Sequence, residues 1–318
     1  MLTIISNFNL ILVIIEEKVD VWDNFLMNSN ESQDINVREL NEKPVLVVGI
    51  VKNIEKTLKK DIQILSKALG FFKEIHWFLV ESESNDKSVN VLSEFKKTNN
   101  YFDYQSLGTS LKDSATRTDV MARARNAYLA YLREKLDQNE FPYVVVADFN
   151  LLNNKLTRKS VLTSWSNDNW DIVTANQSGP YYDIWALRHP LWAPNDCWEH
   201  HSFIRNYVRF PESALTFSIR SRMLRINKKS NWIKVDSSFG GFAIYKSQFL
   251  LMSNYYEGLD ENGKMVCEHV TFHKKLTDNG ARIFINPAMI NTKYTDHSRQ
   301  ITFWPTVIRF IKNLKKLV

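Results

Sequence analysis

The chain has 318 residues, a hydrophobic fraction of 44% and a formal net charge of +6. This composition excludes a collagen-like, linker-dominated or generally disordered protein. The net positive charge is compatible with binding to nucleic acid, to an anionic membrane or to phosphorylated small molecules, and it does not distinguish among these partners. The two cysteines, Cys197 and Cys267, have no metal-binding spacing and favour reduced surroundings.

Residues 1–42 join an apolar segment, 2–15, to a polar stretch, 28–34, that is typical of a loop or linker. No basic region precedes the apolar segment and no small-residue cleavage site follows it, so we expect no secretion signal. No stretch approaches the roughly 20 apolar residues of a membrane span. We therefore predict an accessory N-terminal segment, 1–42, packed on a main domain that spans 43–300.

Buried strands alternate with helices from Pro44 onward. Apolar runs predict strands at 45–51, 75–80, 102–107 and 143–146, and helical spacing of apolar residues predicts helices at 54–72, 89–97 and 118–136. This order predicts an α/β fold with a mostly parallel, doubly wound sheet flanked by helices. Neither G-x-G-x-x-G nor G-x-x-x-x-G-K-[ST] occurs, which disfavours a dinucleotide-binding or P-loop enzyme.

The strand predicted at 143–146 runs into Asp148-Phe149-Asn150. Ligands of open α/β sheets bind at the carboxyl ends of the strands, so Asp148 is expected to face a crevice. Asp148 and Asn150 are two positions apart and project from the same side of an extended backbone. This arrangement suits a divalent cation that in turn holds a diphosphate. The alternative is a turn that Asp148 caps and whose dihedral angles Asn150 tolerates.

Further along, the pattern predicts a helix at 157–165, a strand at 171–175 and an aromatic loop at 181–185. We expect a long irregular region next. Within it, residues 205–234 contain eight Lys or Arg and a single acid, Glu212. Two interpretations of this basic region stay open: a solvated surface, or a phosphate-binding rim for a donor or a lipid-linked acceptor.

The last part of the predicted domain begins with Ser237-Ser238-Phe239-Gly240-Gly241, whose glycines indicate a close backbone approach leading into a strand. A helix opening at Glu268, a strand at 282–285 and a turn at Asn286-Pro287 follow. Residues 301–318 predict a basic amphipathic C-terminal helix, which either docks on its own domain or attaches to an anionic membrane. We expect a cytoplasmic protein, with peripheral attachment to the inner face of a membrane as the alternative.

Several short motifs follow one another in order between Pro44 and His297. They are Glu81 after the second strand, Arg117, Arg123-Ala124-Arg125-Asn126, Ala147-Asp148-Phe149-Asn150, Tyr182-Asp183-Ile184-Trp185, the Ser-Phe-Gly-Gly turn and Glu268-His269. Together they resemble GT-A-type glycosyltransferases, and within that class the CAP59-like capsule-associated mannosyltransferases and the Anp1/Mnn9 mannosyltransferases.

The resemblance implies transfer of a hexose, with mannose as the candidate, from a GDP- or UDP-linked donor to a saccharide or glycolipid acceptor in surface polysaccharide biosynthesis. It implies Asp148, Asn150 and His297 as ligands of Mn²⁺ or Mg²⁺. It also implies donor contacts from residues at the strand ends and on the helix before Asp148, namely Lys52, Asn53, Glu81, Arg117, Arg125 and Asp148 itself. Asn150 departs from the Asp-x-Asp pattern of the family, and a neutral amide oxygen is a weaker metal ligand than a carboxylate.

The resemblance further implies that Glu268 and Asp183 recognise acceptor hydroxyls, one of them as general base if the enzyme inverts configuration. A retaining enzyme would need no such base. Alternatively, Glu268 is a first-turn acid favoured by its helix dipole and Asp183 caps a loop. A degenerate relative that only binds saccharide also stays open, whereas nucleic acid is not expected as a partner because no binding motif accompanies the basic charge.

Overall fold

The computed structural model describes residues 38–108, 116–135, 140–255 and 263–299. Nearly all of the predicted accessory segment, 1–42, and all of the predicted C-terminal helix, 301–318, lie outside the described residues. Both therefore stay predictions.

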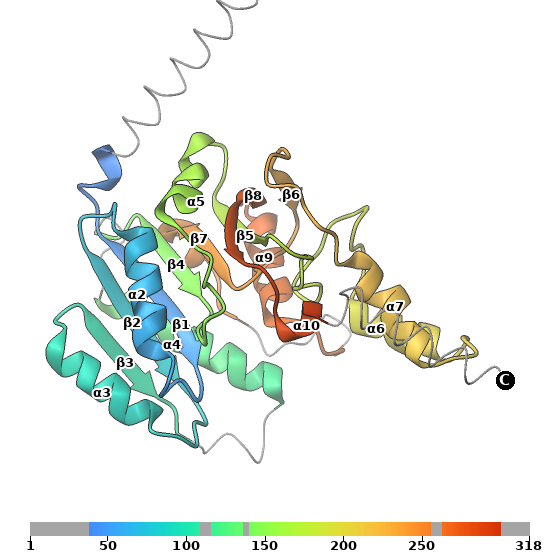
Figure 1. Ribbon diagram of the computed structural model, residues 1–318, viewed down its shortest axis with the longest axis horizontal. Coiled ribbons are helices and arrows are strands. Elements are labelled where there is room, and N and C mark those ends of the chain that lie inside the picture. Colours follow the sequence, from blue (N-terminus) through green and yellow to red (C-terminus); the bar gives the residue numbers. More distant parts are fainter. Residues whose placement is uncertain (1–37, 109–115, 136–139, 256–262, 300–318) are drawn as a thin grey trace, which may run out of the picture.

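A single eight-stranded sheet in the order β3-β2-β1-β4-β7-β5-β8-β6 forms the centre of the described chain (Figure 1). Four pairings are parallel, β3 with β2, β2 with β1, β1 with β4, and β5 with β8. The pairings of β7 with β4 and β5, and of β6 with β8, are antiparallel. The predicted α/β class, a largely parallel sheet flanked by helices, is confirmed. The strands are β1 (Val45–Val51), β2 (Ile75–Glu81), β3 (Phe102–Ser106), β4 (Tyr143–Ala147), β5 (Ile172–Gln177), β6 (Ile233–Val235), β7 (Phe242–Lys246) and β8 (Ile283–Thr292).

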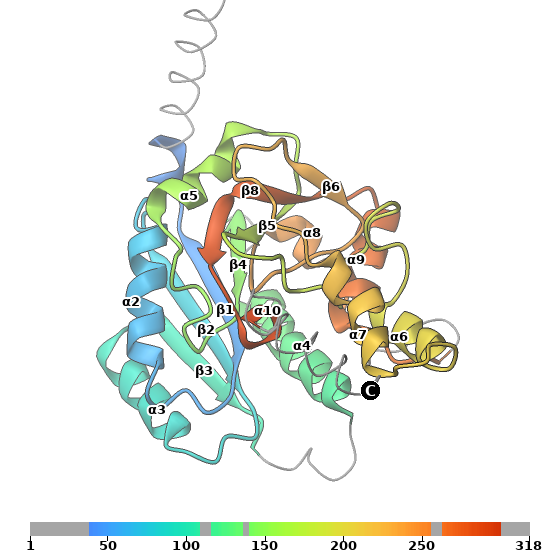
Figure 2. The same ribbon diagram turned by 45° about the vertical axis from the view of Figure 1, so that its right-hand side comes forward.

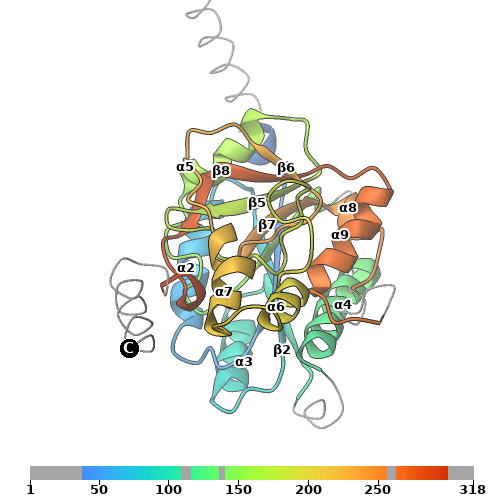
Figure 3. The same cartoon turned by 90° about the vertical axis from the view of Figure 1, so that its right-hand side faces the viewer.

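Helices cover both faces of the sheet because alternate strand residues point to opposite sides. Val45 and Val47 join a core with α2 (Leu58–Leu69), α3 (Ser88–Thr98) and α5 (Arg158–Leu162). Leu46 and Val48 join a second core with α4 (Arg117–Lys135) and α9 (Glu268–Asp278). Figure 3 shows α4 and α9 on one side of the sheet and α2 on the other. The remaining short helices are η1 (Thr163–Ser166), η2 (Arg220–Arg222), α8 (Ser247–Leu250) and α10 (Asp296–Arg299).

The region expected to be long and irregular contains two helices, α6 (Cys197–Arg205) and α7 (Glu212–Ser218), so that expectation was wrong. The Asp196 side chain caps α6 by accepting from the backbone N–H groups of Trp198 and Glu199. The two helices pack against each other and project away from the sheet (Figure 1).

The turn predicted at Asn286-Pro287 was also wrong, because both residues lie inside β8. The register of β8 against β5 shifts between Thr174 and Asn176, which leaves room for a bulge at these positions. The buried Asn286 amide donates to the Thr163 and Ser164 hydroxyls. An Asn-Pro pair is typical of a turn. Here polar side-chain contacts hold Asn286 and Pro287 within a strand. None of the helices in the described part of the chain is long and apolar enough to span a membrane.

Candidate functional site

Three adjoining cavities open at the carboxyl ends of β1, β2 and β4. The first, of about 540 Å³, lies between the loops after β1 and β4 and the segment from Thr292 to Arg299, and we call it the α10 cavity. The second, of about 430 Å³, is lined by α4, the loop at 182–185 and the start of α9, and we call it the aromatic cavity. The third, of about 540 Å³, lies between β1, the loop after β2 and α4, and we call it the α4 cavity. Figure 2 shows α10 lying at the carboxyl ends of β1 and β4.

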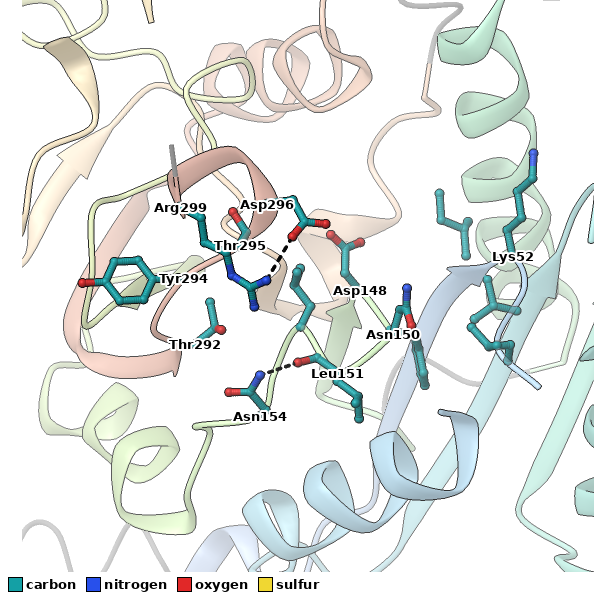
Figure 4. A pocket seen from close by; sticks show the side chains of 15 residues that line it. Lys52, Asp148, Asn150, Leu151, Asn154, Thr292, Tyr294, Thr295, Asp296 and Arg299 are labelled. Atoms are coloured by element: carbon teal, nitrogen blue, oxygen red, sulfur yellow. Dashed lines mark hydrogen bonds and ion pairs between the residues drawn. The ribbon is translucent and has the colours of Figure 1, made fainter. Parts of the chain in front are cut away.

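Three charged side chains connect these cavities, since each of them lines two. Asp148 lines the α10 and aromatic cavities, Lys52 the α10 and α4 cavities, and Arg117 the α4 and aromatic cavities. Figure 4 shows Asp148, Asn150 and Lys52 on one wall of the α10 cavity, opposite Tyr294 and Arg299. One carboxylate and two cations thus lie where the three spaces meet, as expected from the position of Asp148 at the end of a central strand.

The loop that follows Asp148 has a strained backbone. Asn150 and Leu151 have φ angles of 68° and 62°, which are uncommon for residues other than glycine. Asp61, on α2 and only 3% exposed, accepts hydrogen bonds from both backbone N–H groups, at 3.0 Å from Asn150 and 2.8 Å from Leu151. This buried carboxylate fixes the loop that presents Asp148 and Asn150.

The loops after β1 and β2 show the same feature. Asn53 (φ 54°) and Glu83 (φ 59°) are the other residues, apart from glycines, with positive φ among those that the structure describes. All four such residues therefore lie in loops at the carboxyl ends of β1, β2 and β4. Residues in sparsely populated backbone regions tend to gather at ligand-binding sites, where the surrounding structure holds them in place.

The Asp148 carboxylate is half-buried, and no hydrogen bond or ion pair joins it to another described residue. Burial raises its pKa to about 6, and the nearby Asp183 and Glu268 carboxylates add to this effect, against the lowering influence of Arg125 and Arg117. Ionising Asp148 in the folded protein, with no ligand bound, therefore costs free energy. Such a group is a candidate for binding a cation or for proton transfer.

Arg125 and Glu268 form a buried ion pair beside Asp148. The Arg125 Nε donates to the Glu268 Oε1 at 3.0 Å, and both side chains are about 1–2% exposed. The guanidinium carbon also lies 5.3 Å and 5.5 Å from the ring centres of Phe239 and Tyr255. Both residues line the aromatic cavity, but the Glu268 carboxylate is committed to Arg125 in the described structure.

Asp183 is attached to the Gly240-Gly241 turn. Its Oδ2 accepts from the Gly240 N–H at 2.9 Å, and the Gly241 carbonyl accepts from the Asp148 N–H at the same distance. A Cβ built on Gly241, where φ is 83°, would lie 2.5 Å from a Leu152 methyl carbon. The predicted close backbone approach thus exists, and it ties Asp183 to the Asp148 loop. Burial is the main cause of a raised Asp183 pKa.

Asn53 and Glu81 line none of the three cavities, and the contacts predicted between them and the donor stay predictions. Glu81 is 2% exposed and accepts from the Ser84 N–H and the Ser106 hydroxyl. The Asn53 side chain accepts from the Asn85 N–H at 2.8 Å. Both residues hold the loops after β1 and β2 together. Lys52 does line two cavities, where its ammonium pairs with Glu83 at 2.7 Å.

The predicted metal ligands are not assembled as a three-residue group. Asn150 lines the α10 cavity and His297 the aromatic cavity, with Asp148 lining both. The His297 ring stacks on Tyr182 with ring centres 6.4 Å apart. Within the described residues, no set of three or more His, Cys, Asp or Glu side chains is arranged to hold a metal ion. Asp148 and Asn150 line one wall of the α10 cavity, but Asn150 has a φ of 68° and so lacks the extended backbone on which the spacing argument rested.

Sequence reasoning missed Asp61, because it has the pattern of an ordinary polar residue in a helix and its partners are about ninety positions away. It also assigned no role to the aromatic walls. Tyr182, Trp185, Trp198 and Phe239 line the aromatic cavity together with the neutral, buried His269, whose pKa burial lowers well below its ordinary value. The sequence motifs at 182–185 and 237–241 include Tyr182, Trp185 and Phe239, so they could have indicated most of this aromatic wall.

No protein-family model and no curated protein matches the chain. Solved structures similar to it include a mannosyltransferase, PcManGT from Pyrobaculum calidifontis, in complex with GDP-Man and Mn²⁺. The TM-score is 0.41 at 10% identity, over 84% of this chain and 65% of that one.

Residues 1–349 of S. aureus TarS in complex with UDP-GlcNAc give a TM-score of 0.43 at 14% identity, over 82% of this chain and 61% of that one. GalNAc-T7 with UDP, GalNAc and Mn²⁺ gives 0.41 at 12% identity, over 81% and 45%. The chain spans less than two thirds of each of these structures. Similarity at this level does not assign an activity, so the function has to be argued from the residues of the three cavities.

Proposed function

We propose that this chain is a glycosyltransferase that transfers a hexose from a nucleoside diphosphate sugar to a saccharide or lipid-linked acceptor. The observation that carries the proposal is Asp148, a half-buried carboxylate at the end of β4 that has no partner among the described residues and lies where a cation-lined space meets an aromatic one. GDP- and UDP-linked donors are both compatible with these residues, and mannose is the candidate hexose that the sequence resemblance implies.

The donor diphosphate is proposed to lie between Asp148, Lys52 and Arg117. Lys52 and Arg117 line the cavities on either side of β1, and Arg117 is exposed at the start of α4, where no hydrogen bond or ion pair joins it to a described residue. Negative charge grows on the leaving diphosphate during transfer, so cations fixed at this place stabilise the transition state more than the ground state.

A divalent ion is proposed to bind through Asp148 and Asn150. The fit rests on the Asp148 carboxylate, which has no described partner and whose raised pKa a nearby cation would lower. Carboxylate and amide oxygens are suitable ligands for Mn²⁺ or Mg²⁺, and the diphosphate would complete the coordination. When bound, such an ion neutralises charge on the diphosphate. His297 lines the aromatic cavity together with Asp148 and is proposed as a further ligand.

The acceptor is proposed to occupy the aromatic cavity. Tyr182, Trp185 and Trp198 offer ring faces on which a sugar can stack, and Asp183 lies beside them. Asp183 is proposed as the better-placed general base for an inverting reaction, because it is half-buried and burial raises its pKa. Glu268 is then a positioning residue, since its carboxylate holds Arg125.

The test is release of UDP or GDP from a panel of nucleotide sugars, with and without added oligosaccharide acceptors. We expect turnover of one donor by the wild type and a loss of at least about 100-fold in Asp148→Ala, in line with removal of a transition-state contact. Asp168→Ala, an exposed acid in the loop before β5, is the matched control and should retain activity. Equal rates in both variants would contradict the proposal.

A saccharide-binding relative without catalysis is the second candidate, and Asn150 is the observation that favours it. Its left-handed backbone suits asparagine, but its amide is a weaker metal ligand than the carboxylate of an Asp-x-Asp motif. Asn150→Asp should then increase metal affinity or create turnover. If Asn150→Asp changes neither metal affinity nor turnover, while the wild type binds sugar and releases no nucleotide, then weak metal binding at position 150 is not the reason that the chain lacks catalysis.

A further inference from the structure

Exposed aromatic side chains concentrate on the helical pair that projects from the sheet. Trp198, Phe203 and Tyr207 on or just after α6 are 45%, 62% and 76% exposed, and Phe217 on α7 is 57% exposed. Of the strongly exposed aromatic residues in the described part of the chain, only Tyr101 lies elsewhere. We call these four side chains, with Arg205 and Arg209, the α6–α7 surface.

The exposure of these rings is not a consequence of loosely packed helices. Ala214 and Ser218 on α7 are fully buried, and Ile219 just beyond it is 9% exposed and belongs to the core. The exposed rings of Phe203 and Tyr207 lie against each other, with centres 5.0 Å apart. A cluster of several exposed aromatic rings on one projection is unusual for a surface that faces only water, and such patches mark interaction sites.

The charges around the rings identify the chemistry of the partner. Arg205 and Arg209 are exposed next to the aromatic side chains, and the Arg209 guanidinium lies 5.5 Å from the centre of the Phe210 ring. From the start of α6 to the end of η2, residues 197–222 contain four Arg and two acids, Glu199 and Glu212, so the segment carries a net positive charge. Aromatic rings enter the interface between headgroups and acyl chains, and cations beside them attract anionic headgroups.

The surface is continuous with the aromatic cavity. Trp198 belongs to both, and Ile219 and Met223, which follow α7, also line the cavity. The segment from α6 to the end of η2 therefore contributes side chains both to the cavity and to the exposed surface, and α6 and α7 project from the body of the molecule (Figure 1). A bilayer on the outer side would bring a lipid-linked sugar to the cavity mouth.

We propose that the α6–α7 surface docks on an anionic lipid bilayer, with Phe203, Tyr207 and Phe217 inserted at headgroup level and Arg205 and Arg209 paired with lipid phosphates. Docking itself does not depend on the proposed transferase activity. Only the link between docking and a lipid-linked acceptor depends on that activity.

The experiment is flotation of the full chain with vesicles of phosphatidylcholine, alone or mixed with about one third phosphatidylglycerol, at low and high salt. We expect binding to the anionic vesicles that weakens with salt. The triple variant Phe203→Ser, Tyr207→Ser, Phe217→Ser should bind at least about tenfold more weakly. Tyr101→Ser, which removes an exposed ring elsewhere, is the matched control and should bind as the wild type does.

Other outcomes would overturn the proposal. Absence of binding to anionic vesicles excludes it, and undiminished binding of the triple variant assigns the membrane contact to another part of the chain. A wild-type dimer in light scattering that becomes a monomer in the triple variant identifies a second copy as the partner. Thermal unfolding verifies that each variant folds, and binding of UDP- and GDP-sugars without vesicles, unchanged in the triple variant, separates failure of docking from failure of the transferase proposal.

Discussion

Replacing Asp148 with asparagine should make the unliganded protein more stable while removing its function. The wild-type carboxylate is half-buried, lacks a described partner and lies near two further carboxylates, which together raise its pKa from 3.8 to about 6. At about 1.4 kcal/mol per pKa unit, ionising it in the folded state costs at most about 3 kcal/mol relative to the unfolded chain. Allowing for solvent screening, we expect Asp148→Asn to gain about 1–3 kcal/mol at pH 7.5.

The direction of the pKa shift determines at which pH Asp148→Asn is more stable than the wild type. Because the pKa of Asp148 is raised on folding, the folded state binds more protons than the unfolded state between the pKa values of 3.8 and about 6. The stability associated with this group is fully present below the unfolded pKa and is lost as the pH rises through the folded pKa. The difference between Asp148→Asn and wild type should therefore be near zero at acidic pH and largest above about pH 6.

The assay is urea unfolding of both proteins between pH 4 and 8, with Asp168→Asn as an exposed control. A variant that is less stable than wild type at neutral pH would refute the reasoning, because it would mean that the Asp148 charge stabilises the unliganded fold. A gain that is the same at every pH would also refute it, since the cause would then not be ionisation.

Three further substitutions test the contacts around Asp148. Glu268→Gln should lose about 3–5 kcal/mol in urea unfolding because it leaves the Arg125 guanidinium buried without its counter-charge; an unchanged midpoint would mean that the pair is not formed. Asp61→Ala removes the acceptor for two backbone N–H groups and should cost about 1–3 kcal/mol, with weaker donor binding by calorimetry, and intact binding would show that the loop holds its strained shape unaided. Gly241→Ala should lower both the melting temperature and donor binding, since φ is 83° and a Cβ has no space, so a wild-type melting temperature would contradict the turn geometry.

The fold could be predicted where local patterns decide it. The valine-rich runs at β1 and β4 end in polar residues, and a strand of this kind needs cover on both faces, which the intervening helices supply. The two errors have local causes as well. Asn286-Pro287 has the composition of a turn, but the Asn286 amide donates to Thr163 in η1 and the Pro287 carbonyl accepts from the Asn176 amide in β5. The helices α6 and α7 were missed because they are only nine and seven residues long, too short for a clear apolar periodicity.

The site could be predicted only in part, because its key contacts join residues that are far apart in sequence. Asp148, Arg117 and Asp183 were found since they follow strands or motifs that are visible locally, and all three line the cavities. The pairing of Arg125 with Glu268, 143 positions apart, could not be read from spacing. The commitment of Glu81 to its own loop likewise depends on Ser106, on the neighbouring strand.

Calorimetric titration of UDP- and GDP-sugars, with and without Mn²⁺, into wild type and Asp148→Ala tests most directly whether Asp148 marks a nucleotide-sugar site. We predict that one donor binds the wild type, more tightly with the metal, and that Asp148→Ala loses this binding while remaining folded. Undiminished binding to Asp148→Ala, or no binding of any donor to the wild type, would contradict the assignment of the site.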